Sequence, residues 1–183
     1  MQLLCLDIAT TTGWACGTVP DRPLPTPLEL RAGDPVYKPQ SGSYRIPNAH
    51  DASQRLVRYE QWLQDMIAVH KPDVVVFEAP FVTGRTHQNT ARLLMYLAGV
   101  TELTAKKVQG LRFFEENNAR VRKHFINKGS GKRAELKRKT LEACWSLGWM
   151  EFSDTDDNRA DALALWHYAA SFLLARQMQK GAA

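Results

Sequence analysis

The first apolar run of the sequence, residues 3–6, is followed at once by an acid, Asp7. The run is too close to the Thr10-Thr11-Thr12-Gly13 break to form a helix, so it predicts a short strand that is buried on both faces. A carboxylate at the end of such a strand is costly unless a cation, a hydrogen-bond network or a metal ion neutralises it. No Lys or Arg lies within fourteen residues of Asp7. Taken alone, Asp7 is better explained as a turn cap, and the same holds for the threonines.

The pattern of a buried element followed by an acid recurs. Residues 74–77 form a second apolar, β-branched run that ends at Glu78, and Asp161 lies inside an apolar helix predicted after residues 154–158. Asp157 and Asn158 precede Asp161 by four and three residues, so either can share its helix face. An acid in a first helical turn commonly complements the helix dipole, which is the simpler explanation of Asp157.

The remaining segments predict alternating strands and helices, an α/β fold. A Pro-rich excursion over residues 20–47 interrupts them, with one or two short edge strands around residues 28–30 and 43–46. Met95 is expected to face the core, and Lys137, Arg138 and Lys139 the solvent. The other predicted elements are a hairpin strand over residues 13–19, helices over 52–70 and 87–107, a parallel strand over 111–114, a short basic helix over 119–125, a loop over 127–132 and a helix over 133–147.

Composition narrows the class of protein. A chain of 183 residues fits one domain, and three separated cysteines form neither a disulfide framework nor a zinc tetrad, so a reducing, cytoplasmic location is expected. The sequence shows no signal peptide and no membrane span. Residues 106–140 carry twelve Lys or Arg against three Glu, a net charge of +9, whereas the whole chain carries +5. This asymmetry favours a polyanion such as nucleic acid, although a solvated basic face is about as good an explanation of the segment alone.

Acids at the ends of several core elements can meet at the carboxyl edge of a sheet, where open α/β sheets place their sites. Oxygen donors without a His or Cys cluster suit Mg²⁺ or Mn²⁺ better than zinc. Two such ions can activate a water and stabilise the leaving oxygen in phosphodiester cleavage. Together with the basic segment, the acids Asp7, Glu78 and Asp161 predict a nuclease.

Four motifs in this order resemble the RuvC family of Holliday-junction resolvases, most of all its compact phage and bacterial members. They are Leu6-Asp7-Ile8-Ala9-Thr10-Thr11-Thr12-Gly13-Trp14, Val76-Phe77-Glu78-Ala79-Pro80-Phe81, residues 129–137 and residues 158–164. The resemblance implies an RNase H-like fold with a five-stranded mixed β-sheet flanked by α-helices. It also implies two Mg²⁺ ions, replaceable by Mn²⁺, held by Asp7, Glu78 and Asp161.

The resemblance also implies a DNA-binding surface. Phe81 matches an aromatic residue that family members direct toward the opened junction, and an ordinary buried loop Phe is the equal alternative. Lys132 and Lys137 match the basic loop and helix that meet phosphates near the scissile bond, although either lysine alone could be a solvated surface residue. Arg85, Lys128 and Arg133 are predicted to join this surface.

Two departures from the family pattern stand out. The family often has Asp-Pro-Gly-Ser after the first strand, where this chain has Asp7-Ile8-Ala9-Thr10. Many resolvases carry an acid three residues before the final Asp, and this chain has Asn158 there. An Asn carbonyl can ligate magnesium but brings no charge, so one ion is expected to bind more weakly unless Asp157 supplies the fourth ligand.

The sequence therefore predicts a Mg²⁺-dependent endonuclease for branched DNA. Cutting two symmetric strands further implies a homodimer. A non-catalytic nucleic-acid-binding module of the same fold is the main alternative, which Asn158 leaves open. Sugar-kinase and actin-like ATPases also follow their first strand with Asp and a Thr-rich turn, but they need a second such domain and a second phosphate turn, and the sequence has neither.

Overall fold

The structure is a computed structural model and describes residues 1–30, 37–48, 51–80 and 87–181. Its centre is a five-stranded sheet with the order β3-β2-β1-β4-β5. The first three strands pair antiparallel, whereas β4 and β5 run parallel to β1. The mixed five-stranded sheet predicted from the sequence is confirmed. The strands are β1 (Gln2–Asp7), β2 (Thr11–Thr18), β3 (Gln40–Arg45), β4 (Val74–Glu78) and β5 (Arg112–Glu116).

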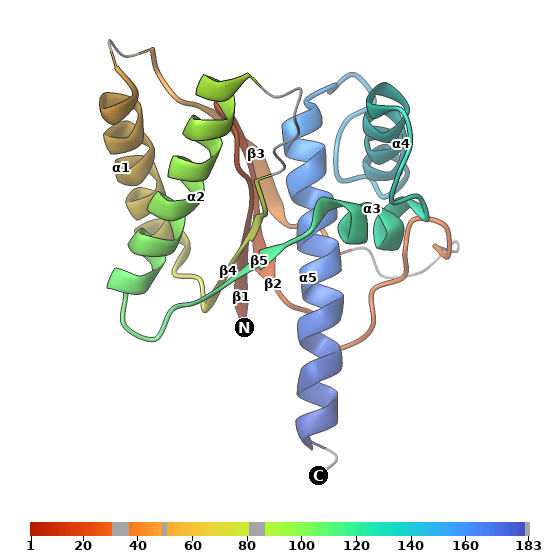
Figure 1. The fold of residues 1–183 in the computed structure, drawn as a ribbon. Helices are drawn as coiled ribbons and strands as arrows, with labels where there is room; N and C mark the ends of the chain where they lie inside the picture. The colour runs from red at the N-terminus through yellow and green to blue at the C-terminus, as the bar shows by residue number, and fades with distance from the viewer. Residues whose placement is uncertain (31–36, 49–50, 81–86, 182–183) are drawn as a thin grey trace.

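Helices cover both faces of the sheet (Figure 1). Helices α1 and α2 lie on one face, and α3, α4 and α5 lie on the other. The predicted helix over residues 52–70 has the observed bounds, and Asp51 caps it by accepting a hydrogen bond from the backbone N–H of Gln54 at 2.8 Å. The helices are α1 (Ala52–His70), α2 (Gln88–Lys107), α3 (Asn118–Ile126), α4 (Arg133–Ser146) and α5 (Asp157–Gly181).

Three expectations were wrong in detail. Residues 27–29 form a turn rather than an edge strand, and the single edge strand of the described excursion begins at Gln40. Met95 is 56% exposed, because the face of α2 that meets the sheet is formed by neighbours such as Leu97 and Ala98. Lys137 is half-buried rather than solvent-facing, because it points toward the start of α5.

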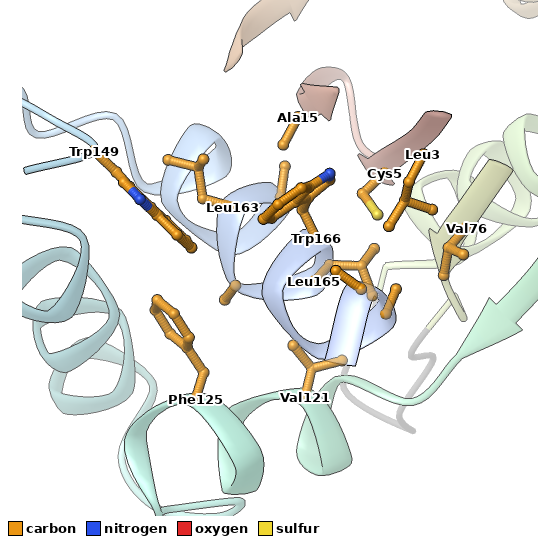
Figure 2. Packing of buried hydrophobic residues seen from close by; sticks show 14 of the residues in the cluster. Leu3, Cys5, Ala15, Val76, Val121, Phe125, Trp149, Leu163, Leu165 and Trp166 are labelled. Atoms are coloured by element: carbon orange, nitrogen blue, oxygen red, sulfur yellow. The ribbon is translucent and has the colours of Figure 1, made fainter. Parts of the chain in front are cut away.

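The alternation of side chains along β1 and β4 builds two separate cores. Leu4, Leu6 and Phe77 pack with α1 and α2. Leu3, Cys5 and Val76 point to the opposite face and meet α5. Figure 2 shows this second core. It is the larger one, and Leu163, Leu165 and Trp166 of α5 stand at its centre between the sheet and the side chains of Val121, Phe125 and Trp149.

Helix α5 is therefore the main structural support of one face. It packs against β1, β2, β3 and β4 as well as against α3 and α4, and its C-terminal half extends past the sheet (Figure 1). None of the helices in the described ranges, α5 included, is both long and apolar enough to cross a bilayer.

Candidate active site

The ends of β1 and β4 bring two carboxylates together. The two strands are parallel and pair Leu6 with Phe77, so Asp7 and Glu78 follow side by side at the same edge of the sheet. The alternation that sends Leu3 and Cys5 toward α5 sends Asp7 to that face as well, and Val74 and Val76 do the same for Glu78. Both acids are half-buried. This juxtaposition follows from strand register alone.

Asp161 completes the group from the other side. It lies in the second turn of α5 and is only 9% exposed. Burial raises the pKa of Asp7 well above its usual range, and the negative charges of Glu78 and Asp161 and a hydrogen bond with Glu78 raise it further. The three carboxylates, distant in the chain, therefore form one electrostatic unit, which we call the acidic cluster.

The pKa of Asp161 is also raised in this cluster. Burial raises it to about 6, and the nearby Glu78 pushes in the same direction, while Arg122 and Lys137 oppose the rise. Desolvated carboxylates of like charge are costly, so the cluster needs positive charge from elsewhere.

Side chains of α3 and α4 supply polar partners for these acids. The guanidinium of Arg122 in α3 lies 3.1 Å from Oδ2 of Asp161. The side-chain amide of Asn118, also in α3, donates a hydrogen bond to Oε1 of Glu78. Lys137 of α4 forms an ion pair with Asp157 at the start of α5. The basic segment identified in the sequence thus faces the acids directly.

Arg122 and Asn118 are site residues that the sequence reasoning missed. Arg122 was one of twelve cations in the basic segment, and nothing in its spacing separated it from the others. Asn118 is the first residue of a helix of nine residues, and no sequence motif links it to Glu78, its partner forty residues earlier in the chain. The available signal was position: α3 follows β5, which ends beside β4, so its first turns lie at the edge that carries the acids.

The donor set fits a hard divalent cation in its chemistry, since the acidic cluster offers only carboxylate oxygens in a partly desolvated place. Within the described ranges, however, no three His, Cys, Asp or Glu side chains are arranged to hold an ion at once. The contacts above give the reason: Asp161 is turned toward Arg122 and Glu78 toward Asn118. An ion that binds Oδ2 of Asp161 would displace the guanidinium of Arg122.

The two candidates for a fourth ligand differ in availability. Asp157 is engaged by Lys137. The side-chain amide of Asn158 has no hydrogen-bond partner within the described part of the chain, and its backbone N–H donates to Oδ1 of Asp156 at 3.1 Å. Asp156 itself accepts from the backbone N–H of Arg159 as well, at 3.1 Å, so it acts as a cap for the start of α5.

The turn after Asp7 is structural. Thr12 is fully buried, and its hydroxyl donates to the backbone carbonyl of Ala9 at 2.9 Å. Gly13 pairs with Asp7 across the β1–β2 ladder, and a Cβ placed on it would lie 1.8 Å from the backbone carbonyl oxygen of Asn158. The start of α5 therefore rests directly on the backbone of β2.

The predicted DNA-binding residues fall into three groups. Phe81 and Arg85 lie outside the described residues. Lys128 pairs with Glu135 at 2.6 Å, and Lys137 pairs with Asp157. Lys132 and Arg133 are exposed at the start of α4, and within the described ranges neither has an ion-pair partner. The structure thus leaves these last two cations free for an external anion.

Three solved structures are similar to this chain in their fold. The chain is similar to RuvC of Thermus thermophilus, with a TM-score of 0.66, 16% identity and coverage of 98% of this chain and 97% of that one. It is similar to T. thermophilus RuvC in complex with a Holliday junction substrate, with a TM-score of 0.65, 14% identity and coverage of 97% and 96%. A further match is the yeast mitochondrial Holliday junction resolvase Ydc2, with a TM-score of 0.56, 10% identity and coverage of 97% of this chain and 82% of that one.

No family model and no curated protein matches the sequence. The likeness is one of three-dimensional structure, and it extends over nearly the whole chain. The fold is the RNase H-like fold of RuvC, as the four sequence motifs predicted.

Proposed function

We propose that this protein is a metal-dependent endonuclease that hydrolyses phosphodiesters of branched DNA. The convergence of Asp7, Glu78 and Asp161 at one sheet edge carries the proposal. Three separated segments contribute these acids, and a structural core has no use for three like charges in a half-buried place. Charged groups that destabilise the folded protein by their closeness are typical of active sites.

Asp7, Glu78 and Asp161 would hold Mg²⁺, or Mn²⁺ in its place. A divalent ion held by these residues would lower the pKa of a water and stabilise negative charge on the phosphate oxygens. Neighbouring side chains orient the acids that would bind the metal. Asn118 orients Glu78 through a hydrogen bond, and Arg122 orients Asp161 through an ion pair. Rigid strand ends and a buried helix turn define the positions of the three acids better than a loop would.

The free cations at the start of α4 would bind the DNA backbone. Lys132 and Arg133 are exposed at the first turn of α4, the helix that carries Lys137, and Lys137 contacts Asp157 beside the acidic cluster. A duplex arm that contacts Lys132 and Arg133 is thereby held next to the carboxylates. Contacts of this kind neutralise phosphates, so binding should weaken steeply as salt concentration rises. Phe81 and Arg85, which follow Glu78 by three and seven residues in the sequence, are further candidates.

Activity on a four-way junction would further require a homodimer, since two symmetric strands are cut by two sites. Helix α2 offers a surface for this purpose: Tyr96 and Leu103 are 41% and 56% exposed, and between them Gly99 faces open space. Light scattering under cleavage conditions should give the mass of two chains. A monomer that still resolves junctions would contradict the dimer but not the nuclease.

The test is a cleavage assay with four-way junctions, forks, flaps and linear duplexes, in Mg²⁺, in Mn²⁺ and in chelator. We expect metal-dependent cleavage of branched substrates and its loss in Asp161→Asn, with junction binding retained. Asp65→Asn is the matched control, since Asp65 is an exposed acid of α1 whose side chain, among the described residues, accepts a hydrogen bond from Gln61 of its own helix and makes no ion pair. Normal cleavage by Asp161→Asn would remove the proposed site.

The main alternative is a nucleic-acid-binding module without catalysis. It has one observation in its favour, since Asp161 is engaged by Arg122 and the neighbouring position is the uncharged Asn158. The same assay decides between the two functions. Salt-sensitive junction binding without cleavage of any substrate in either metal would support the module.

A further inference from the structure

We propose that His124 and His167 form an acid-sensitive contact that docks residues 20–30 on α3 and α5. At neutral pH these residues, which we call the excursion arm, stay docked. Proton uptake by the histidine pair releases the arm while the sheet and the helices stay folded. This inference goes beyond the proposed function, and it concerns the Pro-rich excursion, which has no part in that function.

The excursion arm is attached to the rest of the protein at few points. It leaves β2 and passes beside α5 and α3 (Figure 1). Leu24 and Leu30 pack against the larger core, whereas Leu28 is 72% exposed. Within the described ranges, one hydrogen bond joins the arm to a helix: Nε2 of His167 in α5 lies 3.0 Å from the backbone carbonyl oxygen of Pro25. Docking of the arm therefore depends on two leucines and one histidine.

His167 has almost no contact with solvent in this position. It is 1% exposed, and its ring lies 5.4 Å from the ring of Phe125 and 5.8 Å from the ring of Trp149. Its other ring nitrogen, Nδ1, lies 3.0 Å from Nε2 of His124 in α3. A charged imidazole in this place would lose nearly all of its hydration.

The hydrogen bonds of the pair fit its neutral form. A carbonyl oxygen only accepts, so Nε2 of His167 carries the proton that binds Pro25. Nδ1 of neutral His167 is then an acceptor, and Nε2 of His124 donates to it. A proton added to Nδ1 of His167 faces this N–H unless His124 shifts its own proton to its other nitrogen. A second added proton leaves two N–H groups facing each other at 3.0 Å.

The electrostatics of the pair also oppose proton uptake in the docked state. Burial lowers the pKa of His167 to about 4, and the charge of His124 adds to this, whereas the bond to Pro25 and the charge of Glu29 oppose it. Burial also lowers the pKa of His124. The other titratable groups that face the pair in the described part of the chain are Glu29 of the arm, which is exposed, and Tyr168 of α5. One exposed carboxylate does not replace the lost hydration.

Release of the arm is the smallest movement that hydrates the pair. Nε2 of His167 points to the arm rather than to a helix, so water reaches this nitrogen once Pro25 moves away. The acidic cluster is separate from the pair, since His167 follows Asp161 by six residues and therefore lies on a different side of α5.

The experiment is amide hydrogen exchange of the full chain at pH 7 and pH 5, without metal or DNA, with each rate divided by that of the unfolded peptide at the same pH. The probes are the amides of Glu29 and Leu30, which bind the carbonyl oxygen of Thr26 within the arm. The pKa of His167 is about 4 in the docked state and about 6.5 once the ring is hydrated, so exchange of the arm should rise about 20-fold from pH 7 to pH 5. Low urea concentrations should leave this exchange unchanged, because release exposes little surface.

Three variants separate the histidine from the other contacts. His167→Gln keeps a donor for Pro25 and an acceptor for His124 without a titrating group, so it should reduce the rise to less than about twofold. Leu24→Ala weakens docking alone, so it should speed exchange at both pH values and keep the ratio between them. His70→Gln is the matched control, since His70 is the last residue of α1 and contacts Trp14, and it should behave as the wild type. Thermal unfolding checks that each variant is folded.

The outcomes do not depend on cleavage of DNA. An arm whose exchange is the same at pH 7 and pH 5 would overturn the inference, and so would a full rise in His167→Gln. Arm exchange that rises with urea in step with the slowest amides of α5 would mean global unfolding rather than release. If His167→Gln does not fold, a ratio between the two pH values that Leu24→Ala abolishes would overturn the inference. A protein that cleaves no substrate but releases its arm in acid would leave the inference standing and reject the nuclease.

Discussion

Gly13 is the position where the smallest change in the chain should have the largest effect on the site. It pairs with Asp7 in the β1–β2 ladder, and its missing side chain lets the backbone of α5 approach. A Cβ built at this position lies 1.8 Å from the carbonyl oxygen of Asn158 and 2.3 Å from its carbonyl carbon. Both contacts are with backbone, which cannot rotate away as a side chain could.

The magnitude follows from these distances. An ordinary carbon–oxygen contact needs roughly 3.3 Å, so Gly13→Ala must move the first turn of α5 by about 1.5 Å relative to β2. Overpacking of this kind costs on the order of 1–3 kcal/mol. The same movement carries Asp161 away from Asp7, and a misplacement of about 1 Å in an active site can cost about 10²-fold in rate.

The assay is junction cleavage measured beside thermal unfolding. We expect Gly13→Ala to lose about 10²-fold in cleavage rate and several degrees in Tm, and to bind Mn²⁺ more weakly. Gly99→Ala is the control for the stability measurement alone, since Gly99 lies on the proposed dimer surface of α2. A Cβ at that exposed helical position meets nothing within 4 Å, and alanine there should stabilise the protein by roughly 0.5–1 kcal/mol. Wild-type cleavage and stability in Gly13→Ala would refute the argument that contact with β2 sets the position of α5.

Two further predictions concern ionisable groups. Burial lowers the pKa of His167 to about 4, whereas an unfolded chain titrates near 6.5, so the unfolded state binds a proton that the folded state rejects. Stability should therefore fall by about 3 kcal/mol as pH drops from 6.5 to 4. Urea unfolding at pH 7 and 4.5 should show a smaller loss in His167→Gln, and an equal loss would contradict this. Because burial and its acidic neighbours raise the pKa of Asp7, Asp7→Asn should stabilise the metal-free protein, and the gain should be larger at pH 8 than at pH 5. Thermal unfolding at both pH values measures the difference, and destabilisation at pH 8 would contradict it.

The spacing of apolar residues along the sequence made much of the fold predictable. Strands β1 and β4 are unbroken apolar runs of the kind that only a strand covered on both faces can bury, and α1 shows apolar residues at helical spacing behind a capping Asp51. The approach of Asp7 to Glu78 followed from the same patterns, since parallel strands end at the same edge.

The contacts between side chains of α3, α4 and the acids were not predictable in the same way. Helix α3 is short and polar, so its sequence does not reveal which residues face inward. Helical spacing predicted Lys137 on the solvent side of its helix, but it points toward Asp157 and is half-buried. Such pairings depend on how two helices pack, which no local pattern encodes. Met95 shows the same limit. Helical spacing predicts which side of α2 faces the core, but it does not predict how far around the helix the buried side extends, and Met95 lies outside it.

Helix α5 performs two tasks with one backbone. Trp166 lies less than two turns after Asp161, so the segment that fills the larger core also positions a carboxylate of the proposed active site. Any substitution that lets this helix slide will change the position of Asp161 at the sheet edge, even when the substituted residue lies far from that edge. In the proposed nuclease, thermal resistance and turnover are thereby coupled, and variants selected only for a tighter interior should change in cleavage rate.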